Sequence, residues 1–217
     1  MKRLLFIPST ALRACFLLSF FIFSCAPANQ GSAPQVVNVF ATTSSSLWLD
    51  EIYACADEQS VTLNLTSDAP QITLRLGQPD GWAGPVFQVG TEEIVVAANL
   101  QSPLATLTIE QARTLFAGQG DPSVQVWGYA SAEETQKVFE QAVMNGRSVT
   151  SFARLAVSPA HMSEALSADP NAVGILPRSW MTDQLRELFV AASVPVLILT
   201  PSEPTGVVQD LIACLQK

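Results

Sequence analysis

Hydrophobic and polar positions follow two periodicities along most of this chain. Short runs such as Gln35–Phe40 (QVVNVF) and Ile72–Leu76 (ITLRL) have the apolar or alternating pattern of β-strands. Between such runs, segments such as Leu47–Ala56 place apolar residues at the spacing of one helix face. Strands that alternate with helices in this way predict an α/β protein with mainly parallel sheets flanked by helices.

The other expected elements follow the same two periodicities. Further strands are expected at 62–65, 93–98, 124–129, 173–176 and 194–199, and further helices at 109–116, 133–145, 158–168, 183–191 and 204–215. Thr108 and Gln111 predict a capping box at the start of the 109–116 helix, and Gly118 marks its end.

The N-terminus has the pattern of an export signal. Lys2, Arg3 and Arg13 accompany the apolar run 14–23, which is shorter than the roughly 20 residues of a membrane-spanning helix. An N-terminal membrane anchor is the alternative. The sequence Ile-Phe-Ser-Cys at 22–25 resembles the lipoprotein box of bacteria. This predicts a signal peptide at 1–24, a lipidated Cys25, a flexible tether at 25–34 and a folded domain at 35–217.

The net charge of the mature chain limits the classes of molecule that it can bind. Without the leader, 8 basic residues stand against 19 acidic ones, a net charge of −11. Nucleic acid is therefore excluded as a partner on electrostatic grounds. No spacing of Cys and His residues suggests a metal site, and no cofactor is expected. The protein is expected to be a monomer attached to the membrane through its lipid.

Two cysteines remain once Cys15 and Cys25 are assigned to the signal and the lipid. Cys55 lies in the first helix and Cys214 in the last. An exported chain with one remaining pair suggests a disulfide between them. Two buried free thiols are the alternative.

Several segments resemble the phosphate-binding-protein-like group of type 2 periplasmic binding proteins. The most specific is TIEQARTLFAG at 108–118. Three weaker segments occur with it in the family's order: the hydroxyl-rich turn ATTSSS at 41–46, SAEETQKVF at 131–139 and ADPNAVGILPRSW at 168–180. The resemblance covers most of the mature chain.

This resemblance implies two α/β lobes joined by crossover strands, with a ligand between them and an ABC-type permease as partner. The lobes would comprise residues 35–95 with 177–217, and residues 99–173. Crossovers are expected near 94–99 and 173–176, with another at 196–200. Helix N-termini and backbone N–H groups in such a site favour a small anionic ligand.

The resemblance also indicates candidate ligand residues. Thr43, Ser44, Ser45 and Ser46 lie in the first ligand turn, although one Ser could instead cap the next helix. Arg75 could pair with an anionic group, although an exposed strand arginine is the favoured interpretation. Ser131 and Thr135 flank the second ligand turn.

At that second turn the sequence departs from the family. The family's Ser-Gly-Thr falls on Glu133, Glu134 and Thr135, so only the threonine matches. Two carboxylates would repel a dianion, which argues against phosphate itself. Ser131 with Glu134 is instead expected to form a capping box.

The sequence therefore predicts a lipid-anchored solute-binding protein of an ABC-type importer, with an oxyanion among its candidate ligands. The alternative is a degenerate relative that acts as an envelope interaction or sensor protein. An enzyme is not expected, because no nucleophile pairs with a histidine and no carboxylate pair has a catalytic setting.

Overall fold

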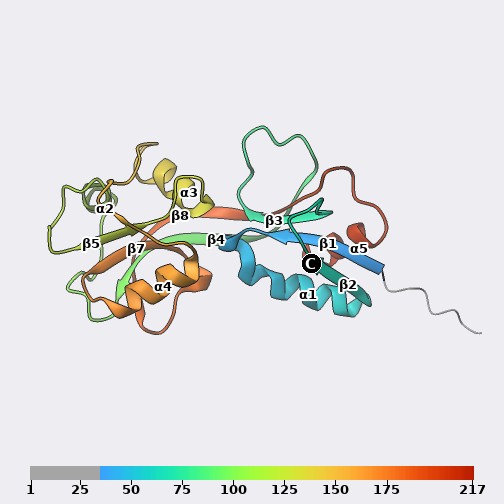
Figure 1. Cartoon of the computed structure of the whole chain (residues 1–217), viewed down its shortest axis with the longest axis horizontal. Helices are drawn as coiled ribbons and strands as arrows, with labels where there is room; N and C mark the ends of the chain where they lie inside the picture. Colours follow the sequence, from blue (N-terminus) through green and yellow to red (C-terminus); the bar gives the residue numbers. More distant parts are fainter. Residues whose placement is uncertain (1–34) are drawn as a thin grey trace, which may run out of the picture. The chain divides into compact units, whose positions relative to one another are not determined.

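The computed structural model describes residues 35–217, which form one mixed α/β unit (Figure 1). The predicted signal peptide, Cys25 and the tether lie outside these residues. The eight strands are β1 (Gln35–Ala41), β2 (Val61–Leu65), β3 (Ile72–Leu76), β4 (Val86–Asn99), β5 (Gln125–Gly128), β6 (Arg154–Leu155), β7 (Ala172–Pro177) and β8 (Leu185–Leu199). The helices are α1 (Leu49–Glu58), α2 (Ile109–Phe116), α3 (Glu134–Ala142), α4 (Pro159–Ala168) and α5 (Val207–Leu215), with short 3₁₀ helices η1 (Thr43–Trp48) and η2 (Arg178–Trp180). No helix within 35–217 is long and apolar enough to cross a membrane.

The strands form one sheet in the order β2-β1-β3-β8-β4-β7-β5-β6. The pairs at both ends are parallel, and the three pairs that involve β8 or β4 in the middle are antiparallel. The predicted α/β class is thus confirmed, and the sheet is mixed because two long central strands run against their neighbours.

The two long strands β4 and β8 are the main departure from the predicted elements. β4 has 14 residues, which extends the strand expected at 93–98 toward its N-terminus. β8 has 15 residues and includes the whole segment 183–191 from Leu185 on, so the helix predicted there is wrong. The two strands pair along their full length with register shifts near Gly90, Val95 and Ala97.

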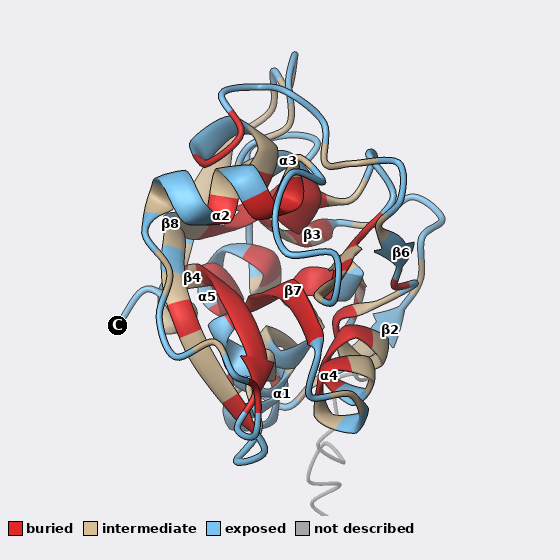
Figure 2. Cartoon of the chain, turned by 90° about the vertical axis from the view of Figure 1, so that its left-hand side faces the viewer, coloured by how far each residue is buried: buried red, intermediate tan, exposed pale blue. Residues whose placement is uncertain are grey.

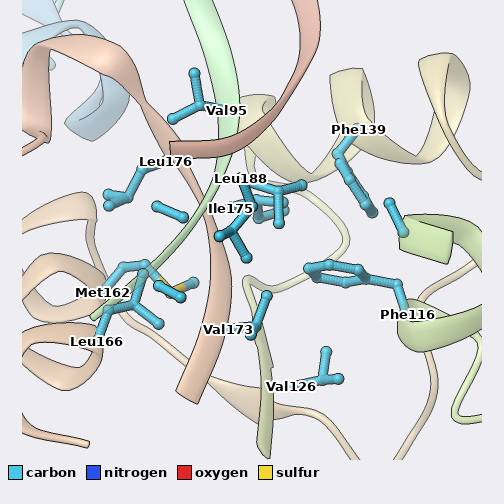
Figure 3. Close-up of a cluster of buried hydrophobic side chains, with 14 of the residues drawn as sticks. Val95, Phe116, Val126, Phe139, Met162, Leu166, Val173, Ile175, Leu176 and Leu188 are labelled. Atoms are coloured by element: carbon cyan, nitrogen blue, oxygen red, sulfur yellow. The ribbon is translucent and has the colours of Figure 1, made fainter. Parts of the chain in front are cut away.

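Two hydrophobic clusters form the core. One lies around Phe116, Phe139 and β7, and the other packs β1, β3, α1 and α5. Figure 3 shows Phe116 beside Phe139, and their ring centroids are 4.6 Å apart. β4 and β8 supply residues to both clusters, with Val95 and Leu188 in the first and Ile94 and Val196 in the second.

β7 belongs to the first cluster alone. All its residues are buried (Figure 2), and its core residues all fall in that cluster. β8 supplies residues to both clusters, whereas the segment 173–176, where a crossover was predicted, supplies them only to the first. The proposed division into lobes stays a prediction.

Local signals account for the helix ends. Thr108 and Gln111 form the predicted capping box of α2, and Gly118 follows its end with φ of +76°. Ser158 caps α4, with Pro159 as its first residue. In contrast, the hydroxyl turn forms η1 before α1 begins at Leu49.

The predicted disulfide is confirmed. Cys55 of α1 and Cys214 of α5 are bonded, with their Cα atoms 6.0 Å apart, and they are 159 positions apart in sequence. The bond joins two helices that both pack on the second cluster.

Candidate functional site

The hydroxyl-rich turn after β1 is held against the neighbouring strand β3. The backbone N–H of Thr42 donates to the carbonyl of Leu74, and the Ser45 hydroxyl donates to the same carbonyl at 2.9 Å. Ser45 is fully buried. These bonds position the hydroxyls of Thr42 and Ser44 beside the C-terminal end of β3. Thr42 makes no side-chain cap bond to η1, and its hydroxyl lies 2.9 Å from the Ser45 hydroxyl.

The first turn of α3 meets this hydroxyl turn. Glu133 is the N-cap residue, and its carboxylate accepts the backbone N–H of Gln136 at 3.1 Å. The Ser44 hydroxyl donates to the other oxygen of Glu133 and lies 2.9 Å from the Thr135 hydroxyl. The capping box predicted from Ser131 and Glu134 is wrong, because Glu133 itself satisfies the helix end.

The Glu134 carboxylate lies at the centre of the contact. Oε2 accepts the Thr42 hydroxyl at 2.8 Å and the backbone N–H of Leu76 at 3.0 Å, and Oε1 pairs with the Arg75 guanidinium at 2.9 Å. Glu134 is only 8% exposed. A buried carboxylate thus receives a hydroxyl, a backbone amide and a guanidinium, the donor types that bind oxyanions in proteins.

We call the Thr42 and Ser44 hydroxyls, the Arg75 guanidinium and the Leu76 N–H the donor cluster. Its members come from the β1–η1 turn and from β3, and all of them contact a carboxylate of α3. Arg75 also donates from Nε to the carbonyl of Gly77, which directs its guanidinium toward α3.

The charge balance of the contact is negative. It contains one guanidinium, which pairs with Glu134, and two carboxylates, those of the adjacent Glu133 and Glu134. Burial raises the pKa of the Glu134 carboxyl above its usual value, although the Leu76 N–H, Arg75 and the Thr42 hydroxyl oppose that rise. Residues 35–217 contain no group of three or more His, Cys, Asp or Glu side chains that could hold a metal ion.

The sequence matches no protein-family model and no curated protein. Solved structures share its fold. A candidate phosphate ABC transporter substrate-binding protein from Clostridium perfringens, solved with bound phosphate, has a TM-score of 0.75 at 14% identity, over 83% of this chain and 93% of that one. An ABC-type phosphate transport receptor from Vibrio cholerae has a TM-score of 0.63 at 16% identity, with the same coverage. The chain has a phosphate-binding-protein-like fold.

The phosphate-binding-protein-like fold is shared with other functions. The regulatory domain of an OxyR2 variant from Vibrio vulnificus has a TM-score of 0.63 at 8% identity, over 84% of this chain and 97% of that one. The fold alone therefore does not give the function, which must be argued from the site.

Within this fold, only some predicted ligand residues meet. Ser44, Arg75 and Thr135 all contact Glu133, Glu134 or one another. Arg75 is not the exposed strand arginine that the sequence favoured, because it pairs with an internal carboxylate. Their role toward a ligand stays a prediction.

The other predicted residues lie apart from the donor cluster. Thr43 is exposed, and the Ser46 hydroxyl donates to its carbonyl. Ser45 holds the turn to β3. Ser131 is exposed and lines a separate cavity of about 210 Å³ with Tyr129.

The sequence indicated Arg75 as a candidate ligand residue, but it predicted neither the pairing of Arg75 with Glu134 nor the contact of the Leu76 N–H. The Leu76 N–H has no sequence signal, because every residue except proline carries one. Arg75 and Glu134 are 59 positions apart, so no local pattern joins them. The pair of adjacent carboxylates was the only available signal.

Proposed function

We propose that this chain is a lipid-anchored extracytoplasmic solute-binding protein of an ABC-type importer. The observation that carries the proposal is the donor cluster, in which groups from two elements converge on the N-terminus of α3. Two similar structures that bear the names of phosphate transport components support the transport role. The predicted export signal and the predicted lipidation of Cys25 support the location.

The proposed ligand site joins the two core clusters. Thr42, Ser44 and Arg75 come from elements of the second cluster, and α3 packs on the first through Phe139. We propose that residues 35–95 and the C-terminal part from about 192 form one lobe, and 99–191 the other. Hinge closure between such lobes is the signal that an importer reads.

Glu133 and Glu134 shape the choice of ligand. Carboxylates on the α3 side favour a solute with a neutral or positively charged group there, and a phosphate dianion would be repelled. The Ser44 and Thr135 hydroxyls are buried beside the Glu133 carboxylate and 2.9 Å from each other, so a solute would reach them only when this contact opens.

Calorimetry on the soluble chain from Ala26 onward tests the proposal. The titrants are phosphate, sulfate, molybdate, small organic anions, amino acids and small cationic or neutral solutes. We expect saturable binding of a solute with a neutral or positive group, and its loss in Ser44→Ala. The exposed Ser202→Ala is the matched control and should bind as the wild type does.

Two results would count against an importer component. One is the absence of binding across the whole panel. The other is normal solute uptake in cells whose only copy carries Ser44→Ala. Both together would favour the envelope interaction protein over the transporter component.

A further inference from the structure

We infer that Glu134 is a tethered occupant of an anion seat, whose carboxylate holds the position that a free oxyanion would otherwise take. The inference deepens the proposed function, because it concerns the selectivity of the same site. It rests on the proposed site and not on transport itself.

The partners of Glu134 carry the inference. A carboxylate and a tetrahedral oxyanion both bind through oxygen lone pairs, and both prefer a hydroxyl, a backbone N–H and a guanidinium as donors. Thr42, Leu76 and Arg75 supply one of each within 3.0 Å. These three donors thus form an oxyanion site that the protein fills with its own side chain.

The position of Glu134 on α3 strengthens this assignment. It is the first residue of a nine-residue helix, where backbone N–H groups and the helix dipole favour negative charge. The side chain leaves this end and reaches across to β3. Because it is covalently attached, its local concentration at the donor cluster is far above that of a dissolved anion.

In the wild-type protein the donor cluster has no donor left for a dissolved anion. Glu134 and Thr135 are buried, and Ser44 between them and Glu133 is fully buried. An oxyanion would have to displace the Glu134 carboxylate and would then lie beside Glu133. Both requirements oppose binding of phosphate and sulfate to the wild-type protein.

Substitution of Glu134 tests the inference with inorganic phosphate and sulfate as probes. Glu134→Gly removes the occupant, and we expect it to bind one of these anions at least about tenfold more tightly than the wild type. Glu134→Gln keeps a side chain of the same size in the seat and should show no such gain. The control Glu110→Gly makes the same change in the first turn of α2 and should bind as the wild type does.

A second pair of variants separates the two carboxylates. Glu133→Ser retains a good N-cap residue and removes the neighbouring charge. Combined with Glu134→Gly, it should tighten anion binding further, while Glu133→Ser alone should not create it. Glu134→Ala replaces Glu134→Gly if the glycine variant does not fold, as judged by circular dichroism and thermal melting.

Four results would overturn the inference. The first is tight phosphate or sulfate binding by the wild type, which needs no variant. The second is a folded Glu134→Gly or Glu134→Ala protein that binds neither anion. The third is equal gain in Glu134→Gln or in the Glu110→Gly control, and the fourth is binding that appears whenever Glu133 alone is replaced.

These results are distinguishable from failure of the proposed function. If Glu134→Gly gains anion binding while the wild type binds no solute and supports no uptake, the inference stands and the transport function falls. If the wild type binds a neutral or cationic solute and Glu134→Gly gains no anion binding, the transport function stands and the inference falls.

Discussion

At the scale of single residues, the chemistry of this protein centres on the contact between Arg75 and Glu134. Arg75 retains 20% side-chain exposure and Glu134 only 9%. A carboxylate at such depth requires compensation, which a hydroxyl, a backbone amide and a guanidinium provide. The sequence placed Arg75 in a strand and Glu134 in the second ligand turn, but it could not predict that they bind each other.

Removal of Arg75 should destabilise the fold. We expect Arg75→Ala to lower the free energy of unfolding by about 3 kcal/mol, because it leaves the buried Glu134 carboxylate without its cation. Urea denaturation measures the change. The exposed Arg147→Ala should stay within about 0.5 kcal/mol of the wild type. An Arg75→Ala/Glu134→Ala protein as unstable as the sum of the two single variants would contradict the pairing.

The raised pKa of Glu134 predicts a pH dependence of stability. Because the folded state holds this proton more tightly than the unfolded state, the contribution of Glu134 to stability is greatest below its ordinary pKa of 4.5. It falls as pH rises through the folded-state pKa, with Arg75 of β3 limiting the fall and the neighbouring Glu133 adding to it.

Comparison with Glu134→Gln isolates this effect. Unfolding free energies are measured for both proteins from about pH 4 to about pH 8. The difference, wild type minus variant, should decrease with rising pH and then level off. An increase of that difference over the same range would show that the folded state lowers the pKa of Glu134.

At the scale of elements, local signals predicted helix ends better than they predicted β8. The segment 183–191 places Leu185 and Leu188 three positions apart, as on a helix face, and both are buried. In the structure both residues lie on a strand. Register shifts against β4 leave Leu188 and Ala191 without direct partners, so the buried positions of this strand do not alternate strictly. Such bulges break the period-two pattern from which a strand is predicted.

The α2 capping box offers a test at this scale. Thr108 accepts the backbone N–H of Gln111 at 3.2 Å, and its own N–H donates to the Gln111 side chain at 2.8 Å. Thr108→Ala should cost about 1 kcal/mol of unfolding free energy in urea denaturation. The exposed Thr114→Ala, within the same helix, should be neutral or slightly stabilising. Equal effects of the two substitutions would argue against the cap.

At the scale of the whole molecule, β4 and β8 connect the two core clusters. Each strand contributes buried residues to both, so the clusters share a continuous pair of backbones. The hydroxyl turn, which follows β1 of the second cluster, contacts the N-terminus of α3, which packs on the first cluster through Phe139. The proposed solute site therefore depends on contacts between segments about 90 positions apart.

The disulfide constrains the second cluster. Reduction, or Cys55→Ser with Cys214→Ser, should lower stability by up to about 4–5 kcal/mol, because it releases a long closed loop in the unfolded chain. Thermal melting with and without reductant measures the loss. The double variant should melt at the same temperature in both conditions. A wild type that reductant does not affect would contradict a stabilising bond.

The sequence by itself determined the features that depend on residues close together in the chain or on the number of cysteines left in the mature protein. Among these are the cap of α2, the turn after β1, the α/β class and the pairing of Cys55 with Cys214. Only the tertiary structure decided that residues 185–191 form a strand and that Glu134 meets Arg75. Both depend on partners far away in the chain, β4 in one case and β3 in the other, and no local pattern specifies such a partner.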